Sequence, residues 1–256
     1  KDVSRCRVWK MEESNATREI QASMRRKDFL IADGHHRFAS SSAFWSGLGD
    51  GSGNGDGAMQ AGILAFFCRV EDPGVISLAT HRCVSGIPAG RLRDLIPWLR
   101  RRYRVHCIAN GPAGTGLSPG NEWLDSLGGS PPAGFRFGVR VRGQANTFLV
   151  CSPDRRKNGR RIFRPGVEDL EDRVLSRYLD LPSSSRRRVS RVSYLRDGRE
   201  AISMVDRNQT DAAFLLEPIP PRKVFGAARD GRLFPPKSTF FFPKVPSGVV
   251  IRPFRD

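Results

Sequence analysis

The chain lacks the features that mark membrane-spanning and secreted proteins. It has no run approaching the roughly 18 to 20 apolar residues that a transmembrane helix needs, and its first residues hold no apolar signal-peptide stretch. Its five cysteines are an odd number without a C-x-x-C pair, which argues against a disulfide framework and a structural zinc site. We therefore expect a cytoplasmic protein that has no membrane partner.

Lysine and histidine are also scarce. Seven of the 43 basic residues are lysine, so 36 are arginine, and the chain has four histidines and a formal net charge of +17. A high content of arginine, glycine, alanine and proline is what a GC-rich genome produces, whereas a large positive charge is typical of nucleic-acid-binding proteins. The basic residues are dispersed, apart from runs at 100–104, 155–164 and 186–191. We favour the compositional interpretation and keep nucleic acid as an alternative partner.

The chain has no initiating methionine and starts almost directly on a strand-like run, so we expect an N-terminally truncated protein. Its length of 256 residues and its 39% hydrophobic content suffice for a packed core. Alternating helical and strand-like spacing predicts an α/β, or mixed α+β, fold with a central mixed sheet and flanking helices. We assign residues 1–150 to an α/β core and residues 151–256 to a C-terminal α/β segment that packs on the same sheet or cleft.

Apolar periodicity divides the chain into individual elements. Helical spacing begins near residues 16, 36, 91, 167, 197 and 223, and Asn15 is expected to cap the first helix. Strand-like runs cover 6–9, 29–32, 105–108, 135–141, 147–151, 192–195 and 212–216. Two further runs, 63–70 and 75–79, flank the turn signal Glu71-Asp-Pro-Gly74 and predict a hairpin.

The stretch 28–38 is the first site candidate. Its apolar run ends at the turn signal Asp33-Gly34, and helical spacing follows. Because the first N–H groups of a helix have no backbone partner, a strand-to-helix turn is a ready anion site. We expect Gly34, His35, His36 and Arg37 to bind phosphate, with Asp33 and His36 as catalytic residues and Asp33 also as a metal ligand. The alternative is that these residues form an ordinary surface loop.

A second cluster follows the apolar run 75–79. Thr80, His81 and Arg82 repeat the residue types of the first candidate at the end of a predicted strand. If that strand neighbours the run 29–32, both clusters face one cleft, and we expect all three residues to bind phosphate. The alternative for His81 is a half-buried residue at a sheet edge.

A third candidate lies near the C-terminus, where two of the seven lysines flank an aromatic run. A lysine ammonium and Ser or Thr hydroxyls suit phosphate oxygens, so we expect Lys237, Ser238, Thr239 and Lys244 to bind phosphate. The glycine spacing of a Walker A loop is absent. Phe240–Phe242 is expected to lie in the core, and a plain surface turn remains open for the three residues before it.

Two of these segments together resemble a known family. Ile31-Ala-Asp-Gly-His-His-Arg-Phe38 and Pro236-Lys-Ser-Thr-Phe-Phe-Phe-Pro-Lys244 are similar to the marker segments of a widespread prokaryotic family of uncharacterised cytosolic proteins, a domain-of-unknown-function family. The resemblance extends over nearly the whole chain, through Thr80-His-Arg82 and Asp211-Ala-Ala-Phe-Leu-Leu216. Members usually carry a further N-terminal region, which agrees with the missing methionine.

The first of these segments is in turn similar to the phosphate-contacting turn of the ParB/sulfiredoxin-like superfamily. That superfamily includes sulfiredoxins, CTP-binding partition proteins and free-serine kinases, and the resemblance implies that Gly34 to Arg37 contact phosphates. Family members typically continue with Tyr-Glu-Thr-Ala, whereas this chain has Phe38-Ala39-Ser40-Ser41. Ala39 cannot replace the glutamate as a base or metal ligand. Either another carboxylate acts, with Asp33 nearest and then Glu71 or Asp72, or this chain binds without turnover.

Two functions follow as expectations. The first is a phosphotransferase resembling a small-molecule kinase, which would use ATP or ADP with magnesium. Its expected partner is a nucleotide or a phosphorylated small molecule. The second is a non-catalytic nucleotide- or nucleic-acid-binding module. Sulfinic-acid chemistry like that of sulfiredoxins needs a cysteine in the phosphate-binding turn, and residues 33–37 contain none.

Overall fold

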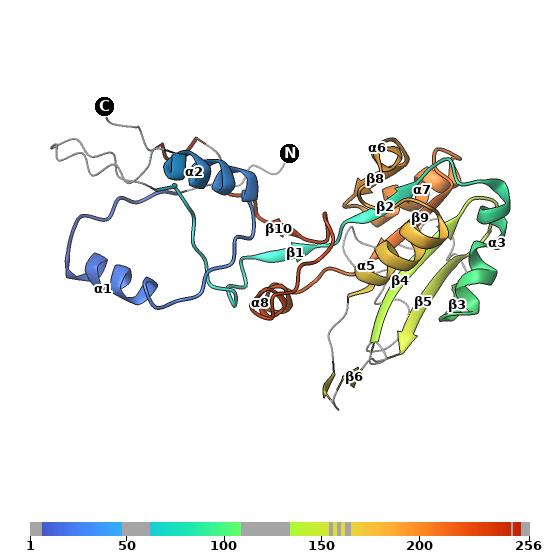
Figure 1. Ribbon diagram of the computed structural model, residues 1–256, viewed down its shortest axis with the longest axis horizontal. Coiled ribbons are helices and arrows are strands. Elements are labelled where there is room, and N and C mark those ends of the chain that lie inside the picture. Colours follow the sequence, from blue (N-terminus) through green and yellow to red (C-terminus); the bar gives the residue numbers. More distant parts are fainter. Residues whose placement is uncertain are drawn as a thin grey trace. The chain divides into compact units, whose positions relative to one another are not determined.

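The computed structural model describes residues 7–47, 62–108, 134–153, 156–157, 160–161, 165–246 and 248–251. The chain divides into two compact units, Lys1–Ala61 and Gly62–Asp256 (Figure 1). The boundary predicted after residue 150 falls inside a strand, β5 (Thr147–Pro153), whereas the two units meet in sequence at residue 61.

The first unit contains two helices. In α1 (Asn15–Met24) the N-cap is Ser14, one residue before the predicted Asn15. The Thr17 N–H donates to the Ser14 hydroxyl at 3.3 Å, and the Ser14 N–H donates to the Thr17 hydroxyl at 2.8 Å. Each side chain thus satisfies a backbone donor that the helix leaves unpaired, and this reciprocal box fixes where the helix starts.

The second helix of this unit, α2 (His35–Gly47), confirms the helix expected after Gly34. The predicted strand 29–32 is wrong, as is the strand expected at 6–9 over its described residues, 7–9. A strand is stable only when another strand pairs with it, and among the described residues no strand pairs with either run. Phe29 is accordingly 54% exposed rather than buried.

The second unit is built on a six-stranded sheet whose order is β3-β5-β4-β9-β2-β8. Its strands are β2 (His81–Val84), β3 (Arg104–Ile108), β4 (Gly134–Val141), β5, β8 (Val192–Leu195) and β9 (Ala212–Leu216). Every pairing in it is antiparallel, so the expectation of a mixed sheet is wrong. The mixed α+β class itself is confirmed.

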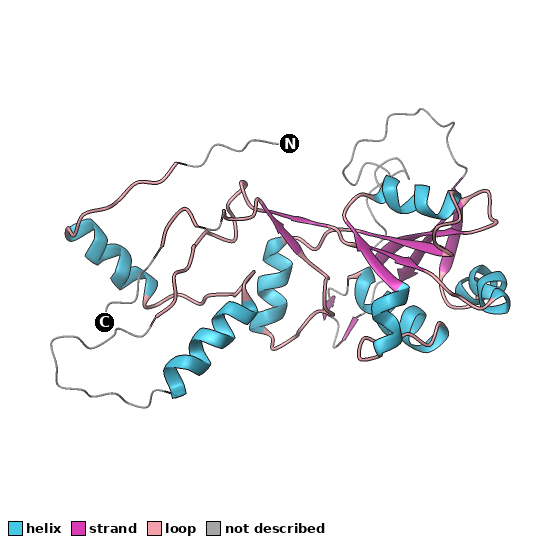
Figure 2. Cartoon of the chain, turned by 90° about the horizontal axis from the view of Figure 1, so that it is seen from above, coloured by secondary structure: helices cyan, strands magenta, loops and turns pink. Residues whose placement is uncertain are grey.

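Helices cover both faces of this sheet (Figure 2). The helices that the structure describes in the second unit are α3 (Ala89–Arg100), α5 (Gly166–Asp169) with its π-helical continuation η1 (Leu170–Tyr178), α6 (Arg186–Arg191), α7 (Gly198–Asp206) and α8 (Pro221–Arg229). The central strand β9 shows how the faces divide: Phe214 and Leu216 enter the core with α3 and η1, whereas Ala213 and Leu215 pack with Ala201 of α7. This period of two places apolar side chains on both faces.

Two smaller ladders complete the second unit. β6 (Arg156–Lys157) pairs with β7 (Arg160–Arg161), and β1 (Ile76–Leu78) pairs with β10 (Phe240–Phe242). The hairpin expected between 63–70 and 75–79 is therefore wrong. Its turn forms, because the Gly74 N–H donates to the Asp72 carboxylate at 2.8 Å, but the second run pairs with the distant phenylalanines instead.

Candidate functional site

The turn into α2 places three donor side chains on one exposed helical end. Gly34 has φ +76°, a left-handed conformation that glycine adopts without strain. The Phe38 N–H donates to the Gly34 carbonyl at 2.9 Å and closes the first turn of the helix. The N–H groups of His35, His36 and Arg37 precede that bond, so the helix offers them no acceptor.

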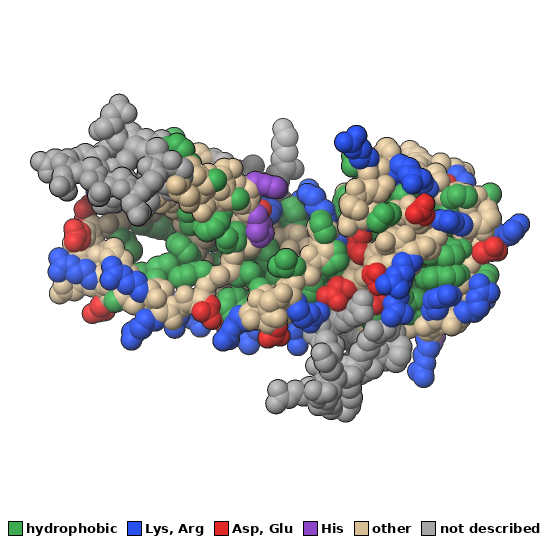
Figure 3. Space-filling view, in the orientation of Figure 1, with side chains coloured by type: hydrophobic (Ala, Val, Ile, Leu, Met, Phe, Trp, Pro, Cys, Tyr) green, Lys and Arg blue, Asp and Glu red, His purple; other side chains and the backbone are tan. Residues whose placement is uncertain are grey.

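The side chain of Arg37 turns back over this start. A Cβ placed on Gly34 would lie 3.1 Å from an Arg37 Nη atom, so glycine is what lets the guanidinium approach the backbone here. His35, His36 and Arg37 are all exposed, and histidine side chains are visible at the surface in Figure 3. The described residues provide no side-chain partner for any of the three. They are therefore available to a ligand.

The second predicted cluster has the opposite character. Thr80, His81 and Arg82 are 8%, 3% and 0% exposed, because β2 lies between β8 and β9 rather than at an edge. The His81 Nδ1 accepts a hydrogen bond from the Leu216 N–H at 3.0 Å. Burial, and then the nearby Arg82 charge, lowers the pKa of His81 to about 4, against an opposing effect of Asp197. The imidazole is therefore neutral at pH 7.

Arg82 is held in a buried ion-pair network. Its Nε donates to Glu171 Oε1 at 3.1 Å, while Arg188 Nη2 donates to the other carboxylate oxygen of Glu171 at 2.6 Å. Tyr194 joins both arginines: its hydroxyl accepts from Arg188 at 3.1 Å, and its ring lies 5.3 Å from the Arg82 guanidinium carbon. One carboxylate thus serves two guanidinium groups. Arg82 is not accessible to a phosphate in this arrangement.

The third predicted cluster lies beside the second. The antiparallel β1–β10 register pairs Leu78 with Phe240. Four residues further along, Arg82 Nη2 donates to the Pro236 carbonyl at 3.3 Å, which continues the same register. The segments that contain Thr80–Arg82 and Lys237–Thr239 therefore run antiparallel side by side. Sequence order alone could not give this contact, because 154 residues separate its two ends.

The side chains of the third cluster differ in what they offer. Lys237 is exposed and has φ +59°, whereas the Ser238 hydroxyl is buried and donates to the Pro235 carbonyl at 2.5 Å. Thr239 is half-buried. Lys244 is exposed, and its Nζ lies 4.4 Å from the centre of the Phe240 ring. Phe240–Phe242 was expected in the core, but Phe242 is 46% exposed.

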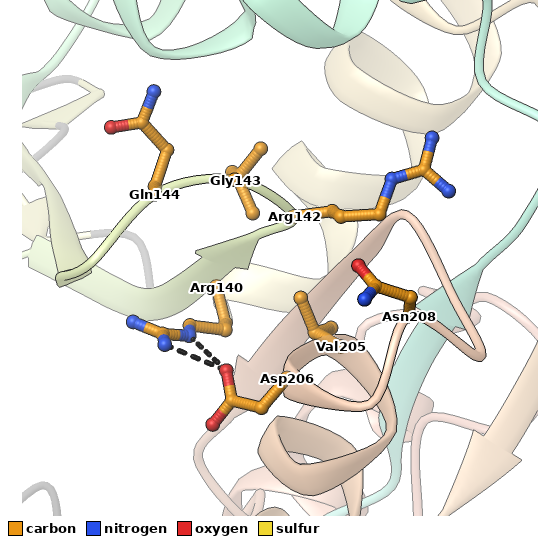
Figure 4. A pocket seen from close by; sticks show the side chains of 8 residues that line it. Arg140, Arg142, Gly143, Gln144, Val205, Asp206 and Asn208 are labelled. Carbon is orange, nitrogen blue, oxygen red and sulfur yellow. Dashed lines mark hydrogen bonds and ion pairs between the residues drawn. The ribbon is translucent and has the colours of Figure 1, made fainter.

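A separate pocket of about 230 Å³ lies at the turn between β4 and β5, beside the end of α7 (Figure 4). Arg140 donates from Nε and Nη2 to one Asp206 oxygen at 2.8 and 2.6 Å. Arg142 Nη1 lies 2.7 Å from an oxygen of Asp211. Both arginines of the pocket are thus already paired with carboxylates, which weakens its attraction for an anionic ligand.

Sequence reasoning missed Glu171, Arg188 and Tyr194. The sequence carries one indirect signal for them: a charged residue inside an apolar strand, such as Arg82, must find a partner because an unpaired buried charge is costly. The sequence could not predict which residue is that partner, because Glu171 lies 89 residues away along the chain.

The described residues contain no group of three or more His, Cys, Asp and Glu side chains arranged to hold a metal ion. Within the same part of the chain, each helix is too short or too polar to cross a membrane.

Comparison with known proteins identifies the family. The protein of unknown function family DUF1015 matches residues 1–180 of the chain. The chain belongs to this family. The expected membership in a family of unknown function is thereby confirmed, and Asp33–Arg37 and Thr80–Arg82 lie within the matched residues of this DUF1015 member. Lys237–Thr239 and Lys244 lie beyond them. A search of curated proteins found no match.

Among solved structures, this DUF1015 chain is similar to a conserved hypothetical protein from Pyrococcus furiosus, with 16% identity, a TM-score of 0.43, and coverage of 84% of this chain and 70% of that one. It is also similar to a free serine kinase in complex with AMP, at 15% identity and a TM-score of 0.43, covering 83% and 66%. A variant of that kinase in complex with ADP has 15% identity and a TM-score of 0.41, and the match covers 83% of this chain and 66% of that one. The chain thus spans about two thirds of the length of these kinase structures.

Proposed function

We propose that the chain binds a nucleotide, or another phosphorylated small molecule, through the turn Asp33–Arg37. The observation that carries this proposal is the start of α2: Gly34 in a left-handed conformation, with the Arg37 guanidinium turned back beside it and two exposed imidazoles following. Helix N-terminal N–H groups and an arginine fork are both donors to phosphate oxygens, and the two kinds of donor add here.

The chemistry that suits these residues is phosphoryl transfer. That reaction depends mainly on positioning and on cationic stabilisation of the transferred group. Arg37 supplies the positive charge, and the two imidazoles beside it supply N–H donors. Asp33 is the carboxylate next to the turn and takes the role of general base or metal ligand. Magnesium commonly uses one or two carboxylates together with substrate phosphates and water, so Asp33 fits such an ion without a larger protein cluster.

Burial decides which of the other predicted phosphate-binding residues remain candidates. Lys237, Thr239 and Lys244 belong to the second unit and stay proposed as phosphate-binding residues there, because their side chains are at least partly exposed. Thr80, His81, Arg82 and Ser238 leave the proposal: all four are buried, and the last three are held by partners within the second unit.

Ligand-dependent stabilisation tests the proposal. A ligand present at 100 times its Kd stabilises a folded protein by about 2.7 kcal/mol, so a thermal melt with ATP, ADP or AMP should show a clear rise in Tm. We expect His36→Ala and Arg37→Ala each to abolish that rise. Arg25→Ala is the matched control, because Arg25 is an exposed arginine near the end of the other helix in the same unit. An unchanged rise in both site variants would refute the proposal.

The alternative is a module that binds nucleotide without turnover, and Ala39 favours it because this position cannot supply a carboxylate. Transfer of labelled γ-phosphate from ATP to candidate small-molecule acceptors separates the two. Turnover that Asp33→Asn removes, with ATP-dependent stabilisation retained, indicates a phosphotransferase. Stabilisation by ATP with no transfer or hydrolysis in the unaltered chain indicates the module.

A further inference from the structure

The surface of α3 carries a concentration of positive charge that the fold does not use. Residues 91–104 include six arginines against one aspartate. Four apolar side chains of α3 are buried in the core: Leu92, Leu95, Ile96 and Leu99. The arginines of this stretch are all exposed: Arg91, Arg93, Arg100, Arg101, Arg102 and Arg104. We call these six residues the α3 arginine surface.

Few of these arginines have acidic partners. Arg93 meets Asp94 at 3.5 Å, but their side chains are 81% and 58% exposed, so water screens this pair strongly. Among the residues that the structure describes, no carboxylate pairs with Arg91, Arg100, Arg101 or Arg104. The surface therefore keeps most of its positive charge.

Helix stability does not account for all of this charge. Arg100 and Arg101 at the end of α3 are favourable to the helix dipole, but Arg91 and Arg93 lie near its positive N-terminal end, where cations are unfavourable and the first turn has no acidic residue. Arg104 lies outside the helix, in β3. An anionic partner would explain positive charge at both ends of the helix.

One part of the surface also offers a flat stacking group. The Arg102 guanidinium carbon lies 4.3 Å from the centre of the Trp98 ring, and Trp98 in turn lies 4.5 Å from Tyr178. A guanidinium that lies over an aromatic ring is a group on which a nucleobase stacks. An anionic membrane fits less well, because membrane-surface helices need a broad exposed apolar face. Four apolar side chains of α3 are buried, and Trp98 lies beneath the Arg102 guanidinium.

We propose that the α3 arginine surface binds the phosphate backbone of nucleic acid without reading its sequence. The surface belongs to the second unit and does not depend on the nucleotide site proposed at Asp33–Arg37, so either can fail without the other.

The test measures binding of the full chain to a labelled random-sequence single-stranded 30-mer by fluorescence anisotropy, as a function of salt. The variant Arg93→Gln/Arg101→Gln/Arg104→Gln removes three charges that make no buried contact. Since each phosphate contact to a single strand contributes about 0.7 to the salt slope, the slope should fall by about 2, and affinity at 0.1 M salt should fall roughly 100-fold. The melting temperature should stay the same.

The control variant Arg186→Gln/Arg187→Gln/Arg222→Gln removes three exposed charges from α6 and α8 of the same unit. If affinity and salt slope change little in the control and fall strongly in the first variant, the result supports binding at the α3 arginine surface. Equal losses in both would show that net charge alone drives binding and would overturn the proposal. No binding at 50 mM salt, or binding only to phosphatidylserine vesicles, would overturn it as well.

Discussion

The dipeptide His-Arg occurs twice in this chain with opposite physical roles. His36-Arg37 lies on the first turn of α2, with both side chains exposed. His81-Arg82 lies in β2, between β9 and the edge strand β8 of a six-stranded sheet. Its imidazole is bonded to a backbone N–H and its guanidinium to a carboxylate and two carbonyls. The same two side chains are available for a ligand in one place and hold the fold in the other.

The difference follows from what lies on either side of each segment. Residues 35–37 begin a helix whose described side chains are mostly exposed, so water solvates their charges. Residues 81 and 82 are flanked by β8 and covered by the helix that carries Glu171, so their charge must be neutralised or paired. A cluster of basic residues therefore indicates a binding site only when its surroundings leave it in contact with solvent.

The largest expected effect is on the buried pair network. Glu171→Ala leaves the guanidinium groups of Arg82 and Arg188 buried without their carboxylate, which should lower the free energy of unfolding by about 3 to 5 kcal/mol. Urea denaturation measures this. The control is the neighbouring Asp172→Asn, because Asp172 pairs with Arg177 at 3.2 Å on the surface and such a pair contributes about 1 kcal/mol at most. Similar losses in the two variants would remove the distinction drawn between buried and exposed clusters.

A pH series should test whether the fold holds His81 neutral. The pKa of His81 falls from 6.5 to about 4 on folding, so its stabilising effect is complete above pH 6.5 and is lost as the pH falls through 4. The full loss amounts to about 3 kcal/mol.

His81→Gln keeps an acceptor for the Leu216 N–H but does not titrate. We expect the difference in unfolding free energy between the unaltered chain and this variant to change between pH 7 and pH 4, as measured by urea denaturation at each pH. A constant difference for His81→Gln would show that its imidazole is not held neutral by the fold.

Gly34→Ala should have a moderate effect on stability and a larger one on binding. An alanine at φ +76° costs roughly 1 kcal/mol, and its Cβ would lie 3.1 Å from the Arg37 guanidinium. Nucleotide-dependent stabilisation should therefore weaken by more than the unfolding free energy alone explains. Gly90→Ala in α3 is the control, because nothing lies within 4 Å of its Cβ position. Retained nucleotide binding in Gly34→Ala would argue against a close role for Arg37.

The smallest expected effect on stability comes from Arg37→Ala. Its guanidinium is exposed, so the free energy of unfolding without ligand should change by about 0.5 kcal/mol or less, whereas Arg82→Ala should lose several times as much. The two variants, measured side by side by urea denaturation, test the comparison directly. A large loss in Arg37→Ala would mean that this arginine supports the fold rather than a ligand.

Local patterns in the sequence determined most of the second unit. The structure contains the helices predicted to start near residues 91, 167, 197 and 223 and the strands predicted at 105–108, 135–141, 192–195 and 212–216. Each has an apolar periodicity, and packing its apolar side chains against the rest of the unit stabilises the fold. The start of α2 after Gly34 was also readable, since a glycine turn followed by helical spacing is a local signal.

Pairing between distant segments was decided by the tertiary structure alone. The sequence predicted that the run 75–79 pairs with its neighbour 63–70, but β1 pairs with Phe240–Phe242. Residue type alone grouped His81-Arg82 with His36-Arg37. The ion pair with Glu171 and the flanking strands instead give Arg82 a role in stabilising the fold. The physical reason is that burial and ion pairing depend on which segments meet across many residues, whereas capping and amphipathic spacing depend on neighbours within a few.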